Sequence, residues 1–349
     1  MCGLPRLQDR TLGNLSGAIP LRCPEVRAPP ALGQQFGAPQ GMWMRHVRED
    51  RDCEGRRVTR PEPLPAPFAD RPFTVREALA EGVPAHRLRA TDLSRPFHGI
   101  RTGDAPSTLW DRCYAYAAGM PDSSFFCGST AAQLHGLPVP PQRKDELHVA
   151  SVSPKNAPRG RGVVGHKLRA LPGDVIVLDG LRVSSAPRAW CELAAQVRIE
   201  DLVAAGDRYL WRKDPFGPLE ALTTAVAHHP GRRGKRNLDR ALELLSDRAD
   251  SPQESRLRVM LIDGGVTGLE VNHPVRIRGR QFFIDLAIPD RKIAIEYLGE
   301  HHGTGDFWRR DAWRRSQLES EGWIVVELVS EDLADPIALA HRILSIRRR

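Results

Sequence analysis

The chain has 349 residues, of which 41% are hydrophobic and 27% are charged, so at roughly 100 to 200 residues per domain it should form two or three domains. It has no uninterrupted apolar run of about 18 residues, which excludes the usual pattern of a membrane-spanning helix. Lys and Arg number 51 against 43 Asp and Glu, a formal net charge of +8 at pH 7, and this excess is compatible with a polyanionic partner without identifying it.

The cysteines and the first residues of the chain bear on its compartment. The six cysteines are scattered without a Cys-x-x-Cys pair, which argues against a disulfide framework and a structural zinc site. Residues 1–20 lack a cationic start, an apolar stretch and a small-residue cleavage site, so no secretory signal is expected. We therefore expect a cytoplasmic protein without membrane contact.

Residues 1–67 differ in composition from the rest of the chain. They hold ten of the 29 prolines and show no apolar periodicity, so they cannot bury enough surface to offset the entropy of ordering. This composition predicts a disordered extension. An alternative is that translation begins downstream, at Met42 or Met44, so that residues 1–41 are not translated.

Residues 68–105 are predicted to form a winged helix-turn-helix. Thr74 and Glu77 form a capping box for a short helix that Gly82 can end. A second short helix fits 84–91, and a small strand and turn fit 96–102. Basic side chains on the second helix and the wing would meet phosphates or base edges in a major groove; they are Arg87, Arg89, Arg95 and Arg101. An alternative is a helical hairpin that packs on the next domain.

Residues 106–248 are predicted to form a mixed α/β middle domain. Helices fit 107–119, 129–135 and 188–211, the last with an interruption near 198, and strands fit 146–152 and 162–168. No catalytic spacing emerges in this stretch. The basic tract at 232–236, Arg-Arg-Gly-Lys-Arg, can bind phosphate by charge, although a solvated connector explains it equally well.

Residues 249–349 contain a predicted helix followed by an antiparallel hairpin. Ser251 as N-cap and Pro252 at the first helical position begin the helix, and strands fit 281–288 and 293–298 around a turn-rich connection. An even-numbered loop centred on 290 and 291 would place two acids opposite each other, Asp285 and Glu296. At about 4 Å and an effective dielectric near 20, their repulsion is about 4 kcal/mol. A shared Mg²⁺ or Mn²⁺ ion would compensate it; alternatives are a bulge that separates the acids or a carboxyl that protonates.

The C-terminal pattern resembles the PD-(D/E)XK nuclease fold, in the branch similar to very short patch repair endonucleases. The resemblance covers about 250–335 and rests on the segments 251–258, 283–285, 293–302, 310–311 and 322–326. It implies that Asp285 and Glu296 bind the metal and that Glu254 supports the metal or its water. As the third residue of a Ser-x-x-Glu capping box, Glu254 has an equally plausible structural role.

The same resemblance suggests further residues for the site. His301 or His302 would position the attacking water or protonate the leaving oxygen, unless they are surface histidines. A helix over 306–321 would hold the phosphates of the scissile strand, unless its basic residues pair with neighbouring acids instead; its candidates are Arg310, Arg314 and Gln317. Leu298 departs from the pattern, since the fold carries lysine there and this branch commonly aspartate.

Upstream, residues 72–103, 128–138 and 184–190 are similar to winged-helix antitoxins of type IV abortive-infection toxin–antitoxin systems. This similarity implies operator binding, with a cognate toxin or a second copy of the chain as partner. The overall expectation is an α/β (α+β overall) DNA-binding protein with a restriction-endonuclease-like α/β/α domain at 249–349. It would hydrolyse phosphodiester bonds with Mg²⁺ or Mn²⁺ in DNA repair or in defence against phages and mobile elements. The alternative is a non-catalytic antitoxin-type repressor, because Leu298 can neither bind a metal nor transfer a proton.

Overall fold

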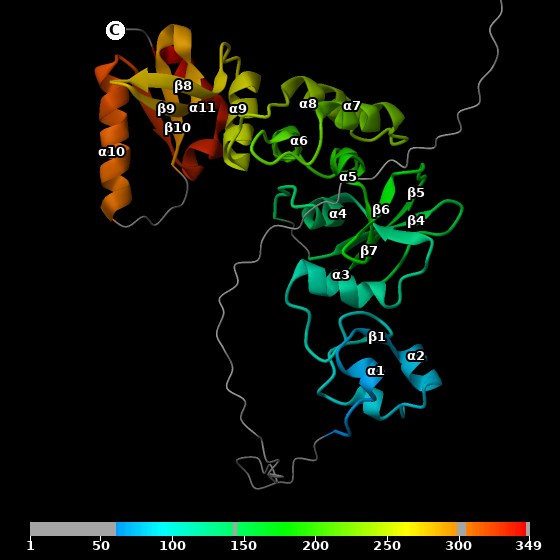
Figure 1. The fold of residues 1–349 in the computed structure, drawn as a ribbon. Coiled ribbons are helices and arrows are strands. Elements are labelled where there is room, and N and C mark those ends of the chain that lie inside the picture. Colours follow the sequence, from blue (N-terminus) through cyan, green and yellow to red (C-terminus); the bar gives the residue numbers. More distant parts are fainter. Residues whose placement is uncertain (1–60, 142–144, 299–304, 347–349) are drawn as a thin grey trace, which may run out of the picture. The chain divides into compact units, whose positions relative to one another are not determined.

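The computed structural model describes residues 61–141, 145–298 and 305–346. All described residues belong to one compact unit, Arg60–Arg349. Within these ranges the protein is a mixed α/β structure with eleven α-helices and three β-sheets, built from parallel and antiparallel strand pairs (Figure 1). None of the helices in the described ranges combines the length and the apolar character needed to cross a bilayer.

The first described elements form a small helical unit with a two-stranded antiparallel sheet. They are α1 (Ala66–Ala69), β1 (Phe73–Thr74), α2 (Val75–Ala80), the 3-10 helix η1 (Arg87–Arg89) and β2 (Ile100–Arg101). The predicted start of α2 is confirmed, because the Thr74 hydroxyl accepts a hydrogen bond from the Glu77 amide at 3.0 Å. Gly82 follows the helix with a φ of 82°, the left-handed conformation that suits a residue ending a helix.

The second helix predicted over 84–91 is wrong, because this segment forms only the three-residue η1. A helical bond from the Leu88 amide to the Pro84 carbonyl measures 3.4 Å, and the following bonds, such as Ala90 to Arg87, span three residues instead of four. A segment of eight residues nucleates a helix poorly on its own. Here the pairing of the Arg87 side chain with Asp92 closes the segment into a compact turn.

The middle of the described chain is a five-stranded sheet in the order β5-β4-β3-β7-β6, surrounded by helices (Figure 1). The elements are α3 (Leu109–Ala117), β3 (Ser124–Phe126), α4 (Gly128–Leu134), β4 (Leu147–Val152), β5 (Val163–Leu168), β6 (Val175–Leu178), β7 (Leu181–Ser184), α5 (Ala186–Leu193), α6 (Ile199–Leu210), α7 (Leu219–His228) and α8 (Lys235–Leu244). All helices and strands predicted for this stretch are present, including the interruption near 198, which separates α5 from α6. Strands β3, β6 and β7 and helices α7 and α8 were not predicted.

The core of this part extends across the predicted domain boundaries. Trp190 of α5 is fully buried, and its indole N–H donates to the Leu202 carbonyl of α6 at 2.9 Å. The same apolar cluster includes Phe97 and Ile100 from the preceding unit and Val259 from the following one. Most buried apolar residues before 95 and after 248 form clusters of their own, so only a few side chains link the middle part to its neighbours.

The C-terminal part is a four-stranded sheet in the order β11-β10-β9-β8. Its elements are α9 (Pro252–Asp263), β8 (Glu270–Ile277), β9 (Arg280–Ile288), the 3-10 helix η2 (Pro289–Arg291), β10 (Ile293–Tyr297), α10 (Gly305–Ser320), β11 (Ile324–Leu328), the 3-10 helix η3 (Ser330–Ala334) and α11 (Pro336–Ser345). Strands β10 and β11 are parallel, and the other pairs are antiparallel.

Helices cover both faces of this sheet. Leu257 of α9 and Ile343 of α11 share one apolar cluster with Leu286 and Ile295. Leu318 of α10 belongs to a second cluster, with Ala287 of β9 and Ala294 of β10. Ala287 directly follows Leu286 in the sequence, and Ala294 directly precedes Ile295. Because successive residues of a strand point to opposite faces, α9 and α11 lie on one face and α10 on the other.

Candidate functional site

The antiparallel pairing of β9 with β10 brings Asp285 and Glu296 together. Ile293 pairs with Ile288, and Ile295 pairs with Leu286, and the residues that follow these pairs, Glu296 and Asp285, lie close enough for the charge of Asp285 to raise the pKa of Glu296. The connection is η2 plus Lys292, which takes a φ of 49° to close the turn. The predicted register is therefore confirmed.

Glu296 lies on the face of the sheet that α10 covers. It is two residues along β10 from Ala294, which packs with Leu318 of α10, and residues two apart share a face. The Arg314 guanidinium of α10 confirms this placement, since its Nη2 lies 3.0 Å from Glu296 Oε1 and 2.9 Å from Oε2. It also donates to the Phe283 carbonyl on β9.

Asp285 is held by the backbone of the neighbouring strand. The amide of Tyr297 donates to Asp285 Oδ2 at 3.1 Å, so this carboxyl group bends across the ladder toward β10. The regular pairs between the two strands end at Leu286 and Ile295, one residue before the acids.

A third and a fourth carboxylate approach from the start of α9. The Ser251 hydroxyl accepts from the Glu254 amide at 3.2 Å, as an N-cap does. The Glu254 carboxylate accepts from the amide of Asp250 at 2.9 Å. Glu254 therefore has the local structural role that its position predicted, and its 7% exposed side chain also carries charge into the cluster.

Asp250 is fixed by donors from three directions. Its carboxylate accepts from the Trp211 indole at 2.9 Å, from Lys213 Nζ at 2.9 Å and from Asn272 Nδ2 at 2.6 Å. Asn272 lies on β8 at the register position opposite Asp285 and has a φ of 51°. The sequence analysis did not single out Asp250, although an acid just before a helix N-terminus is a common electrostatic signal.

Burial and mutual repulsion make these carboxyl groups hard to ionise. Burial, followed by the charge of Asp285, raises the pKa of Glu296 to about 8 and the pKa of Glu254 to about 7. The pKa of Asp285 is also raised, chiefly by burial, while the Tyr297 amide and Arg314 oppose the rise. Without another cation, the cluster therefore retains protons at neutral pH, which was the second alternative to a shared metal ion.

The donor set suits a hard divalent ion that keeps part of its water shell. No group of three or more His, Cys, Asp or Glu side chains within the described ranges gathers closely enough to form a complete ligand set. Magnesium commonly binds one or two carboxylates and completes its shell with water and phosphate oxygens. Asp285 and Glu296 fit that requirement. Because Arg314 contacts both oxygens of Glu296, it must release at least one of them when a metal ion binds.

Several predicted site residues are not part of this described geometry. His301 and His302 lie outside the described residues, and Arg310 belongs to α10 but its side chain is not described. Gln317 of α10 is half-buried. Leu298 follows β10, and its amide donates to the Leu328 carbonyl at 2.7 Å, so the leucine sits at the sheet end beside the cluster.

The arginines predicted to contact DNA near the N-terminus differ in their surroundings. Arg87 is 6% exposed and makes a two-point contact with Asp92, at 2.9 and 2.8 Å, while it also donates to the Glu62 carbonyl. Its guanidinium is occupied inside the protein and is not presented to a phosphate. Arg101 is half-buried and donates to the Leu88 and Ile100 carbonyls, each at 2.8 Å. Arg89 is exposed.

Comparisons with known proteins identify two relatives whose names state no activity. No protein-family model matches the chain. Two uncharacterized proteins of Mycobacterium tuberculosis, MT2308 of strain CDC 1551 / Oshkosh and Rv2248 of strain ATCC 25618 / H37Rv, are each 29% identical to the chain over 256 residues. The similarity covers 72% of this chain and 91% of each relative.

Proposed function

We propose that this protein binds DNA and that residues 249–349 form a metal-dependent endonuclease-like domain of the PD-(D/E)XK type. The observation that carries the proposal is the pair Asp285 and Glu296, which neighbouring antiparallel strands bring close enough together for the charge of Asp285 to raise the pKa of Glu296. Glu254 from α9 joins them closely enough for its charge to influence Glu296. The four-stranded sheet with helices on both faces supports the α/β/α arrangement that the resemblance implies.

The residues divide the chemistry of phosphodiester hydrolysis among them. Asp285 and Glu296 would hold Mg²⁺ or Mn²⁺, which when bound activates water and offsets charge on the departing oxygen. Glu254 would accept a proton from the attacking water or orient it. Arg314 binds the oxygens of Glu296 in the structure, and a phosphate of the scissile strand offers it an alternative anionic partner. DNA repair and defence against phages or mobile elements are the settings in which such an activity is expected.

A second candidate is a non-catalytic repressor of the antitoxin type, with a cognate toxin or a second copy of the chain as partner. Two observations favour it. Leu298 supplies no functional group at the end of β10, and Arg314 already contacts both carboxyl oxygens of Glu296 in the described structure. In this candidate the C-terminal fold persists without turnover.

A cleavage assay separates the two candidates. Supercoiled plasmid and single-stranded DNA are incubated with Mg²⁺ or Mn²⁺ and with wild type, Asp285→Asn, Glu296→Gln or the control Asp290→Asn, which alters an exposed acid in the turn between the same strands. The endonuclease proposal expects metal-dependent nicking that falls on the order of 100-fold or more in the two cluster variants and persists in the control. Equal nicking by all four proteins would refute it. Binding to DNA without any nicking would favour the repressor.

Metal binding provides a readout that does not depend on turnover. Manganese binding followed by electron paramagnetic resonance should show a site in wild type and in Asp290→Asn. The same site should be lost or weakened by about 10 to 100-fold in Asp285→Asn. Unchanged manganese affinity in Asp285→Asn and Glu296→Gln would show that these residues are not metal ligands.

A further inference from the structure

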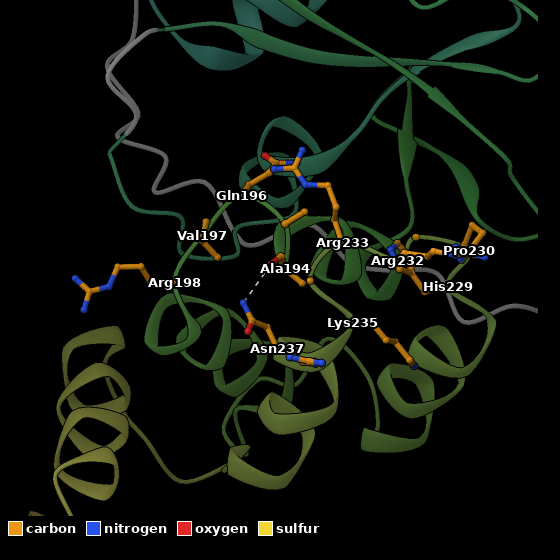
Figure 2. A pocket seen from close by; sticks show the side chains of 14 residues that line it. Ala194, Gln196, Val197, Arg198, His229, Pro230, Arg232, Arg233, Lys235 and Asn237 are labelled. Carbon is orange, nitrogen blue, oxygen red and sulfur yellow. Dashed lines mark hydrogen bonds between the residues drawn. The ribbon is translucent and has the colours of Figure 1, made fainter.

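A basic groove lies in the middle part of the chain, outside the carboxylate cluster. Two segments line it, 194–198 after α5 and 229–237 around the start of α8, and the space they enclose is about 950 Å³ (Figure 2). The Asn237 side-chain amide donates to the Ala194 carbonyl at 3.5 Å and joins the two segments. The groove contains the basic tract at 232–236, which the proposed nuclease chemistry does not use.

The charge of the groove has one sign. Among its fourteen described lining residues five are cationic and none is acidic; the cations are Arg198, Arg232, Arg233, Lys235 and Arg236. Two of them have partners just outside the groove, since Arg198 pairs with Glu200 at 2.5 Å and Lys235 pairs with Asp239 at 3.2 Å. The side chains of Arg232, Arg233 and Arg236 pair with no acceptor in the part of the chain that the structure describes. Mutual repulsion among these cations would be relieved by an anion in the groove.

The backbone at the start of α8 adds positive potential. Gly234 takes a φ of 79° as the N-cap of this ten-residue helix, no side chain caps it, and its first turn has no acid. The amide of Lys235 donates to the Arg232 carbonyl at 3.4 Å, and the following amides of the first turn lie at the positive end of the helix dipole without a side-chain cap. A Cβ at 234 would lie 2.6 Å from the Ala194 backbone, so only glycine allows the two segments to approach this closely.

A partly buried histidine, His229, lines the same groove, and its pKa is lowered. His229 Nδ1 is buried and has no hydrogen-bond partner among the described residues. Burial, followed by the positive charges of Arg188 and Lys235, lowers the pKa of His229 to about 4. The imidazole is therefore neutral near pH 7, so the positive charge of the groove comes from its arginines and its lysine.

We propose that this groove binds phosphates of a nucleic-acid backbone, at a site separate from the carboxylate cluster. Four of its five cations are arginines, whose planar fork matches two phosphate oxygens, and cations along two chain segments suit successive phosphates better than a single ion. The apolar lining is limited to small side chains such as Ala195, Val197 and Pro230, which gives a lipid surface little to hold. The proposal rests on the proposed function in taking DNA as the ligand, but it does not require the cluster to cleave it.

The test compares two triple variants of equal charge. The groove variant is Arg232→Gln, Arg233→Gln and Arg236→Gln; the control variant is Lys155→Gln, Arg159→Gln and Arg161→Gln, which removes three exposed cations of the middle part that lie outside the groove. Affinity for a fluorescent DNA duplex is measured by anisotropy over a series of salt concentrations. Three lost phosphate contacts should lower the salt slope by about 2 to 3 and the affinity on the order of 100-fold near 0.1 M salt. The control should retain the wild-type slope.

Each other result overturns the proposal. An unchanged slope in the groove variant, or an equal loss in the control, would mean that the groove makes no specific phosphate contact. Binding of inorganic pyrophosphate that the groove variant abolishes, with DNA affinity unchanged, would assign the groove to a small phosphate ligand. Equal dependence on these residues for binding anionic vesicles would assign it to a lipid headgroup. The proposed nuclease function can fail on its own. In that case the protein shows no metal-dependent nicking, but the groove variant still lowers the salt dependence of DNA binding.

Discussion

Replacing Glu296 by glutamine should stabilise the folded protein at neutral and alkaline pH when no metal is present. Burial and the charge of Asp285 raise the pKa of this carboxyl from 4.5 to about 8, so the folded protein keeps a proton that the unfolded chain has lost. The contribution of Glu296 to stability is therefore complete below pH 4.5 and falls as the pH rises toward 8. Glutamine mimics the protonated form and removes this dependence.

The size of the effect follows from the width of that pH interval. Between pH 4.5 and pH 7 the unfolded carboxyl is largely ionised and the folded one is not, and at about 1.4 kcal/mol per pH unit the wild type loses about 3 kcal/mol. Near pH 5 the advantage of the variant should shrink to less than about 1 kcal/mol. The hydrogen bond from Arg314 survives the substitution, because the glutamine carbonyl can still accept it.

Urea unfolding followed by circular dichroism measures this difference. Wild type, Glu296→Gln and the control Asp290→Asn are compared in EDTA at about pH 5, 7 and 8.5. The free energy of unfolding of Glu296→Gln should exceed that of wild type by an amount that grows with pH, while the control follows wild type. A variant curve parallel to wild type over the whole range, or a variant less stable above pH 7, would refute the reasoning. Millimolar Mg²⁺ should reduce the decrease in the free energy of unfolding at high pH for the wild type and not for Glu296→Gln.

Further substitutions test the structural roles of two buried arginines, Arg258 and Arg87, with the exposed Arg89 as a control. Arg258→Met leaves Asp207, 2% exposed, without the guanidinium that lies 2.7 Å from it, so the free energy of unfolding should fall by about 3 to 5 kcal/mol; a urea titration that shows a change below 1 kcal/mol would contradict this. Arg87→Ala should cost about 1 to 3 kcal/mol through the lost contact with Asp92, whereas Arg89→Ala should change stability by less than about 0.5 kcal/mol. If Arg87→Ala weakened DNA binding at unchanged melting temperature, Arg87 would instead contact DNA directly.

The predictable part of the site follows from local chemistry. The start of α9 is determined by Ser251, Pro252 and Glu254, whose capping interactions involve residues three or four apart. The register of β9 and β10 follows from the length of their connection, and it brings Asp285 close to Glu296 without knowledge of the rest of the fold. Such short-range features are readable because few alternative structures satisfy them.

The unpredicted part depends on contacts between distant segments. Arg314 was expected to face a phosphate, but the docking of α10 on the sheet brings it to Glu296, eighteen residues earlier in the chain. Arg87 was assigned to the surface of a helix, but tertiary packing buries it between Asp92 and the Glu62 carbonyl. The charge of an arginine does not indicate whether its partner is a ligand or the protein itself. That choice is made by the packing of whole elements.

Leu298 raises the question of which group moves the proton if the cluster is catalytic. Arg314 supplies a positive charge 2.9 Å from Glu296, but a guanidinium does not release its proton at neutral pH, so it replaces the charge of a lysine and not its chemistry. Among the described residues of the cluster, Glu254, with a pKa raised to about 7, is best matched to proton transfer near neutral pH.

Leu298→Lys and Glu254→Gln distinguish a complete site from a degenerate one. If Glu254 serves as the base, wild type cleaves DNA with Mg²⁺, Glu254→Gln lowers the rate on the order of 100-fold, and Leu298→Lys changes it little. If the missing lysine has silenced the site, wild type is inactive and Leu298→Lys gains nicking that a second substitution, Asp285→Asn, abolishes. Wild-type cleavage that Glu254→Gln leaves intact would exclude Glu254 as the base, and the proton would have to pass to a group beyond the described residues.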